Sequence, residues 1–310
     1  MPGLTQRIVY IISLSAVFMM SACRKESESV IVTGNDIPVY NGIPTILIEN
    51  YVNRLFIDMI GREPTDEEMD ERVTSLRENS LSEEARIELV QELMFSEAPV
   101  EGDTSYTRAY FNKLYGDFKA RFLEGASQAT ILEEYNLQVY LIDFLTQTGD
   151  IQSAQIMEIE AAKTADVLNV RTELRTGAIL VDEACRRMCF NSIYDDINMN
   201  SFNFINASFD QLFFRFPTQA EFDQVYPVIE YNLAGTLFGQ AIQNKQEYLS
   251  LMTSVDEFAE GMIRWAYLNL LSRDPNSAEV LDLMDEFQND FDYQTVQQKI
   301  LISDEYAGFD

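Results

Sequence analysis

The sequence predicts an all-α, multi-helical fold built of stacked helical units. Along most of the chain, apolar residues recur at spacings of three and four, which is the period of a helix with one buried face. Three segments also share one helix–turn–helix pattern, and such internal repetition is typical of stacked helices. With 310 residues, of which 46% are hydrophobic, the chain is long and apolar enough to bury a substantial core.

Residues 1–22 have the pattern of a secretory signal peptide. Arg7 supplies a positive charge, and the apolar stretch Ile8–Met20 is too short for a bilayer, which takes about 20 residues. The stretch ends in Met20-Ser21-Ala22-Cys23, which resembles the lipobox of bacterial lipoproteins, with Met20 where leucine is commoner. This resemblance implies cleavage before Cys23 and acyl chains that hold the protein to a membrane through that cysteine.

Residues 23–45 are expected to form the lipidated cysteine and a flexible tether, because small and polar residues with two prolines show little periodicity there. The segment Arg24–Ser29, a lysine followed by acidic residues, resembles the surface-export signal of Bacteroidetes lipoproteins. That resemblance implies an outer-membrane lipoprotein. The sequence leaves open whether it faces the cell surface or the periplasm.

Three segments place an Arg-x-Pro turn between two helices. Each has an arginine, a proline two residues later, a capping residue directly after the proline, and a glutamate three residues beyond the cap: Arg62, Pro64, Thr65 and Glu68; Arg215, Pro217, Thr218 and Glu221; Arg273, Pro275, Asn276 and Glu279. The proline stops the first helix, and the cap and glutamate form a capping box that starts the next. We expect each arginine to bind carbonyls or a carboxylate within its own turn; a ligand site formed by converging arginines is the alternative.

Two of these repeat units resemble helical modules of other proteins. The first, Asn53 to about Leu123, resembles a domain of unknown function in planctomycete cytochrome-like proteins, whose Gly-Pro-Pro-Thr-type turn corresponds to Gly61–Glu68. The third, with Leu271–Pro275 and the ending Ser303–Tyr306, resembles a bacterial surface-protein module similar to phycobilisome linker domains. These motifs encode caps and turns, and the planctomycete haem motif Cys-x-x-Cys-His is absent, so no cofactor is expected.

We expect each repeat unit to consist of a helix, the turn, two further helices and a polar stop. The second unit is expected to close near Ile242–Tyr248. We expect the helical body to have two regions: an N-terminal helical region (46–197) and a C-terminal helical region (198–310) with two repeat units. Within the first, Gly149-Asp150 predicts a break, and Ala154–Leu174 predicts a long helix that stops at Gly177.

Cys185 and Cys189 are four residues apart, which puts them on one face of a helix with Cα atoms about 6 Å apart. The oxidising envelope favours a structural disulfide, which we predict. Buried free thiols are the alternative. Redox or metal chemistry is disfavoured, because redox pairs are typically Cys-x-x-Cys.

The aromatic cluster Phe213, Phe214 and Phe216 exceeds what one helical stripe can bury. We expect most of it in the core, with a partner-binding patch as the alternative. Acidic clusters such as Asp290-Phe291-Asp292 suit a solvated face better than calcium, because Thr295 and Leu301 stand where an EF-hand loop needs glycine and glutamate. No metal site is predicted.

The net charge and the lack of histidine exclude several classes of function. A net charge of −29 repels nucleic acid, and the absence of histidine removes Ser-His-Asp and Cys-His catalysis. We therefore expect a non-enzymatic, membrane-anchored interaction or accessory subunit of an envelope assembly for secretion, motility or nutrient uptake, with an envelope protein as its partner. The alternative is a surface lipoprotein that binds a glycan or peptide.

Overall fold

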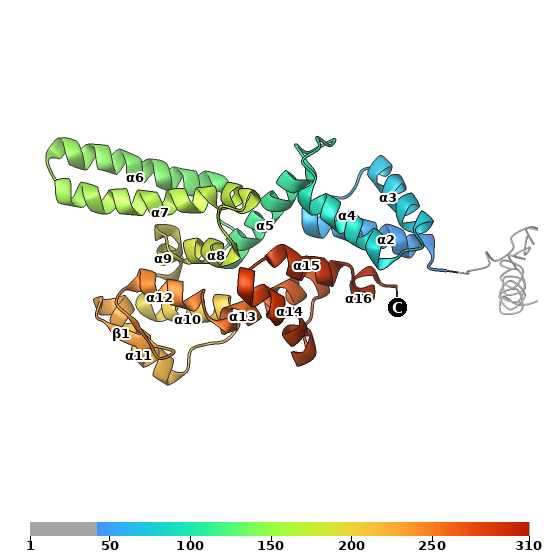
Figure 1. Ribbon diagram of the computed structural model, residues 1–310. Helices are drawn as coiled ribbons and strands as arrows, with labels where there is room; N and C mark the ends of the chain where they lie inside the picture. Colours follow the sequence, from blue (N-terminus) through green and yellow to red (C-terminus); the bar gives the residue numbers. More distant parts are fainter. Residues whose placement is uncertain (1–41, 310) are drawn as a thin grey trace, which may run out of the picture. The chain divides into compact units, whose positions relative to one another are not determined.

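The computed structural model describes residues 42–309, and within this range the predicted all-α, multi-helical fold is confirmed. Figure 1 shows helix following helix, with one short β-hairpin. The predicted signal peptide, Cys23 and most of the tether lie outside the described residues. At the end of the expected tether, Ile43 already packs against the core and the first described helix begins at Thr45.

The first repeat unit has the predicted order of helices. Helix α2 (Thr45–Leu55) continues into a π-helical turn, η1 (Phe56–Ile60), and the turn at Arg62 leads to α3 (Asp66–Glu78) and α4 (Glu83–Phe95). Gly61 ends η1 with φ +83°, a conformation that glycine adopts without a steric penalty. Helix α5 (Tyr106–Phe122) follows and packs on η1 and α4.

Four helices occupy the middle of the chain: α6 (Gln128–Thr148), α7 (Ile151–Thr176), α8 (Val181–Cys189) and α9 (Ser192–Asn198). The predicted break at Gly149-Asp150 and the stop at Gly177 are confirmed. Helices α6 and α7 lie side by side as a hairpin, and α7 also packs on α5 and α8. Figure 1 shows the far end of this hairpin extending beyond the other helices.

The second repeat unit departs from the prediction. Helices α10 (Ser201–Phe213) and α11 (Gln219–Tyr231) form as expected, but antiparallel strands β1 (Gly235–Leu237) and β2 (Gln240–Ile242) replace the expected third helix. The two residues between the strands, Phe238 and Gly239, both have positive φ, as a tight hairpin turn requires. The predicted polar stop is wrong as well, because Asn244 starts a helix, α12 (Lys245–Met252).

The third repeat unit matches the prediction. It comprises α13 (Asp256–Leu271), α14 (Ser277–Asp290), α15 (Tyr293–Leu301) and a final short helix, α16 (Asp304–Ala307). The predicted capping boxes form in all three units, at Thr65, Thr218 and Asn276. Because each cap bonds within three residues, the sequence alone places the start of the second helix in every unit.

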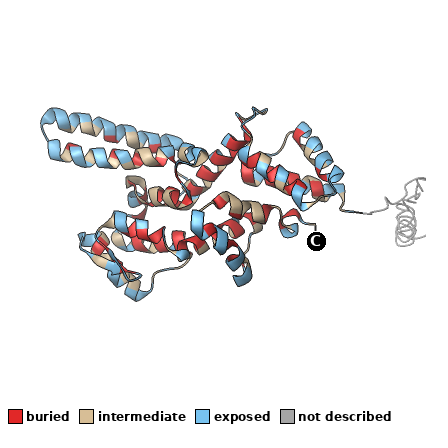
Figure 2. Ribbon diagram, in the orientation of Figure 1, coloured by how far each residue is buried: buried red, intermediate tan, exposed pale blue. Residues whose placement is uncertain are grey.

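From Ile43 onward the described chain forms one compact body with a continuous apolar core, marked by the buried residues in Figure 2. The C-terminal helices pack against the N-terminal ones, α16 on α2 and α15 on α4. Tyr51 donates a hydrogen bond to the Leu301 carbonyl at 3.2 Å, and Arg86 pairs with Asp304 at 2.7 Å. The predicted regions 46–197 and 198–310 therefore share one core. Within residues 42–309, no helix combines the length and apolar character needed to cross a membrane.

Candidate functional site

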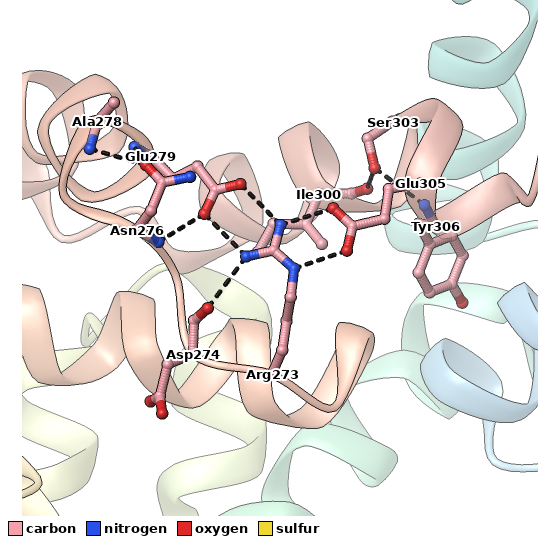
Figure 3. A network of polar contacts seen from close by, with 9 residues as sticks. All are labelled: Arg273, Asp274, Asn276, Ala278, Glu279, Ile300, Ser303, Glu305 and Tyr306. Carbon is pink, nitrogen blue, oxygen red and sulfur yellow. Dashed lines mark hydrogen bonds and ion pairs between the residues drawn. The ribbon is translucent and has the colours of Figure 1, made fainter. Parts of the chain in front are cut away.

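Each Arg-x-Pro turn is held by one fully bonded arginine, and Figure 3 shows the third. Arg273 binds Glu279 through Nη1 and Nη2 at 2.9 and 2.7 Å. Its Nε and Nη2 bind Glu305 at 2.6 Å each, and Nη1 also donates to the Asp274 carbonyl at 3.0 Å. All five N–H groups of the guanidinium thus have an acceptor.

The other two turns repeat this arrangement. Arg62 binds Glu68 and Asp103, and Arg215 binds Glu221 and Glu257. Their remaining N–H groups donate to nearby carbonyl oxygens, at Glu63 and Glu101 for the first arginine and at Phe216 for the second. The predicted structural role is confirmed. Because every N–H group is used within the protein, these arginines have no donor left for a ligand.

Sequence reasoning missed two parts of each turn. The second carboxylate comes from farther along the chain: from Asp103 in the loop before α5, from Glu257 in the first turn of α13, and from Glu305 on α16. In addition, an aromatic ring six residues before each arginine lies against its guanidinium, at 5.5 Å for Phe56, 5.1 Å for Phe209 and 5.1 Å for Tyr267. The recurring aromatic was visible in the sequence as part of the apolar stripe, but its contact with arginine was not.

The first turn is the most extensively bonded of the three. Glu68 accepts hydrogen bonds from Arg62, from the Thr65 N–H at 2.7 Å and from the Tyr106 hydroxyl at 2.7 Å. Burial by itself raises the pKa of Glu68, but these bonds stabilise the carboxylate and lower that pKa to about 2. The pKa of Glu221 and that of Glu279 are also lowered by their arginines.

The predicted disulfide is absent. Cys185 and Cys189 are buried free thiols on α8, a regular helix in which side chains four residues apart do not approach closely enough for a bond without distortion. Cys185 Sγ lies 3.9 Å from Met262 Sδ instead. Burial raises the pKa of the Cys189 thiol to about 12 and that of Cys185 well above its usual value, which keeps both protonated at neutral pH.

The phenylalanine cluster does not form one surface patch. Phe213 is only 4% exposed and belongs to the core, so its proposed contact with a partner is wrong. Phe214 has φ +57°, which ends α10 and places its ring 4.1 Å from the Arg121 guanidinium. Only Phe216, 67% exposed, lies open to solvent.

Several large apolar side chains are exposed on the α6–α7 hairpin, much of which is marked as exposed in Figure 2. Leu137, Tyr140 and Phe144 form a stripe along α6 and are 51, 64 and 51% exposed, and Ile156 and Ile159 on α7 are 56 and 59% exposed. Helix α6 buries only Ile131 and Gln138. The sequence signal was available: apolar residues occupy several faces of α6, more than α7, its main neighbour, can cover.

A cavity of about 580 Å³ lies between α5, α10 and α13. Its lining includes Asp117 and Arg121 from α5, Asp210 from α10, Phe214, and Trp265 from α13. Arg121 donates from Nε to the Gln211 carbonyl at 2.8 Å and from Nη2 to the same oxygen. Nothing in the sequence indicates that these residues meet, because they come from three helices far apart in the chain. Across residues 42–309, no group of three or more Cys, Asp or Glu side chains is placed to hold a metal ion.

Comparison with protein families, with curated proteins and with solved structures finds no match to this chain. The resemblances to planctomycete, phycobilisome-linker and Bacteroidetes proteins therefore stay predictions.

Proposed function

We propose that this protein is a non-enzymatic, lipid-anchored interaction subunit of a bacterial envelope assembly, and that it binds its partner through α6 and α7. The observation that carries this proposal is the exposed apolar stripe Leu137, Tyr140 and Phe144. Contiguous apolar side chains on a protein surface are costly in water and mark interaction sites. A partner helix or groove that covers the stripe would bury them.

The charges around the stripe favour a basic partner. Between Arg121 and Lys163 the chain has no lysine or arginine, whereas Glu133, Glu134 and Asp143 lie on α6 itself. Complementary charges raise the association rate and exclude wrong partners. The partner is therefore a protein with an apolar face rimmed by lysine and arginine. A second copy of this acidic chain would bring like charges together.

The membrane attachment is proposed from Met20-Ser21-Ala22-Cys23. An acyl anchor on Cys23 would hold the protein at the outer membrane, while an acidic body of net charge −29 would be repelled by anionic lipid headgroups. Metabolic labelling with a radioactive fatty acid tests this step. The label should be incorporated by the wild type and lost in Cys23→Ser, with release of the variant from the membrane fraction; labelling of the variant would contradict the anchor.

Co-purification tests the interaction. Tagged full-length protein is purified from its native envelope in mild detergent, beside the variant Leu137→Ser/Tyr140→Ser/Phe144→Ser. A matched control replaces three exposed apolar residues outside the hairpin: Met199→Ser/Phe216→Ser/Leu281→Ser. A stoichiometric partner should be lost with the α6 variant and kept with the control, while circular dichroism shows the same helix content in all three proteins. Retention of the partner by the α6 variant, or the absence of any partner, would overturn the proposal.

Binding of a small ligand is the second candidate function. One observation favours it, the cavity at Arg121.

A further inference from the structure

Arg121 differs from the three turn arginines in having an unoccupied hydrogen-bonding edge. A guanidinium offers two edges that can bind a carboxylate: the pair Nη1–Nη2 and the pair Nε–Nη2. At Arg273 both edges are filled, the first by Glu279 and the second by Glu305. At Arg121 the Gln211 carbonyl fills the second edge alone.

The Nη1–Nη2 edge of Arg121 makes no hydrogen bond or ion pair with any residue in the range 42–309. In the turn arginines, this same edge binds the glutamate of the capping box. Arg121 lines the 580 Å³ cavity, so its side chain borders space that a ligand can enter.

The guanidinium is also fixed in place. Phe214 lies 4.1 Å from it and Trp265 5.5 Å. Gln211, which binds its other edge, is itself held by the Tyr194 hydroxyl at 2.7 Å and donates to the Arg121 carbonyl at 2.9 Å. Burial lowers the pKa of Arg121, and the attraction of nearby groups such as Asp210 offsets this effect only in part. A fixed, partly desolvated guanidinium loses little entropy when it binds an anion.

The other charged groups of the cavity are acidic. Asp117 is paired with Lys113 at 2.7 Å, whereas Asp210 is exposed and its side chain bonds to no residue in the described part of the chain. An anion without a positive group would be repelled by these carboxylates and by the chain's net charge of −29. A ligand that also carries an amine can bind Asp210 and avoid this repulsion.

We propose that the cavity binds a small zwitterion, an amino acid or short peptide. Its carboxylate binds the Nη1–Nη2 edge of Arg121, its ammonium group binds Asp210, and Trp265 and Phe214 form the apolar wall. This site is separate from the α6–α7 hairpin and does not depend on the proposed partner binding; it rests on the second candidate function and names its ligand class.

Trp265 is the only tryptophan of the chain and lines the cavity, so its fluorescence reports on binding. Full-length protein in mild detergent is titrated with the standard amino acids and with the dipeptide Ala-Ala. Two blocked probes, Ala-Ala amide and N-acetyl-Ala-Ala, lack the carboxylate and the ammonium group respectively. We expect a saturable fluorescence change with at least one free zwitterion. Blocking either end of Ala-Ala should weaken binding about tenfold or more, because a charged group then loses its partner.

Two variants locate the ligand. Arg121→Lys keeps the charge but cannot bind a carboxylate through two parallel N–H groups, so affinity should fall about tenfold. Asp210→Asn should weaken binding of Ala-Ala but leave N-acetyl-Ala-Ala unchanged, a difference that a merely structural role would not produce. Because Asp210 is exposed and makes no side-chain bond to the described chain, this variant keeps the test valid even if Arg121→Lys misfolds.

Asp143→Asn on α6 is the matched control and should bind like the wild type. The inference is overturned if no zwitterion gives a saturable change, if the blocked probes bind as well as Ala-Ala, or if Asp210→Asn weakens all probes equally. Loss of partner binding by the α6 variant would not affect any of these results, so failure of the two proposals can be told apart.

Discussion

Helices α6 and α13 are equally hydrophobic on average, yet only α13 is buried. More than half of the residues of α13 are buried, including Phe258, Met262 and Trp265. In α6 the only buried residues are Ile131 and Gln138. The two helices thus differ in what surrounds them and not in how apolar they are.

Their neighbours explain the difference. Helix α13 packs against α10, α14 and α15, which cover it on several sides, whereas α6 packs mainly against α7. The backbone of α10 also approaches α13 closely at Gly261, where a Cβ atom would lie 2.1 Å from the Leu212 carbonyl oxygen. Apolar content therefore does not decide burial by itself. An uncovered apolar helix such as α6 is available to a partner.

The largest effect is expected from matched phenylalanine substitutions. Phe258 on α13 is fully buried, so Phe258→Ala should lower the free energy of unfolding by about 3–5 kcal/mol. Phe144 on α6 is half exposed, and Phe144→Ala should change the free energy of unfolding by less than about 0.5 kcal/mol. Urea denaturation followed by circular dichroism measures both. Equal destabilisation by the two variants would show that α6 is covered in the free protein.

Two glycine substitutions should change the stability of the protein in opposite directions. Gly261→Ala forces α10 and α13 apart and should destabilise the protein by about 1–3 kcal/mol. Gly116 lies within α5 with open space around its Cβ position, so Gly116→Ala should stabilise it by about 0.5–1 kcal/mol. Thermal melting of the two variants beside the wild type tests the pair. A raised melting temperature for Gly261→Ala would refute the close approach of α10 to α13.

A smaller loss of stability is expected from substitution of Arg273 at the C-terminal end of α13. Arg273 joins this end of the helix to α14 and α16 through ion pairs with Glu279 and Glu305. Arg273→Ala should therefore lower the free energy of unfolding by about 1–2 kcal/mol. This value is below that for buried charged hydrogen bonds because the turn is partly exposed. Arg264 on the same helix pairs only with Glu260 one turn away, and Arg264→Ala should cost less than about 0.5 kcal/mol. Urea denaturation separates the two. A comparable cost for both would mean that the turn network adds nothing to an ordinary surface pair.

The smallest expected effect is a pH dependence of stability at the Arg62–Glu68 turn. This turn of the first repeat unit corresponds to the turn at the end of α13. The pKa of Glu68 is about 2 in the folded protein, below its ordinary value of 4.5. Its contribution to stability is therefore fully present above about pH 4.5 and is lost as pH falls towards 2. After allowance for solvent screening, we expect ionised Glu68 to contribute about 1 kcal/mol to the free energy of unfolding.

Glu68→Gln should remove this part of the pH dependence, measured as the difference in unfolding free energy from the wild type at pH 7 and pH 3. Glu67→Gln, an exposed neighbour, is the control and should follow the wild type. If the difference between wild type and Glu68→Gln stays constant over this range, the carboxylate of Glu68 is not held by Arg62.

The sequence by itself determined the Arg-x-Pro turn of each repeat unit and the two helices that this turn joins. Pro64 and Thr65 act within a few residues, since a proline cannot continue a helix and a threonine caps the one that follows, so these features can be read locally. In the second unit, Phe238 adopts a positive φ in the turn between the two strands, a conformation that its residue type does not signal.

Only the tertiary structure decided which groups meet. The second carboxylates of the turns lie 41, 42 and 32 residues from their arginines, at Asp103, Glu257 and Glu305. The burial of Phe213, the exposure of Phe144 and the free edge of Arg121 likewise depend on which helices become neighbours. Hydrogen bonds of caps are closed within one helical turn, whereas burial and ion pairing depend on chain segments that the local sequence does not specify.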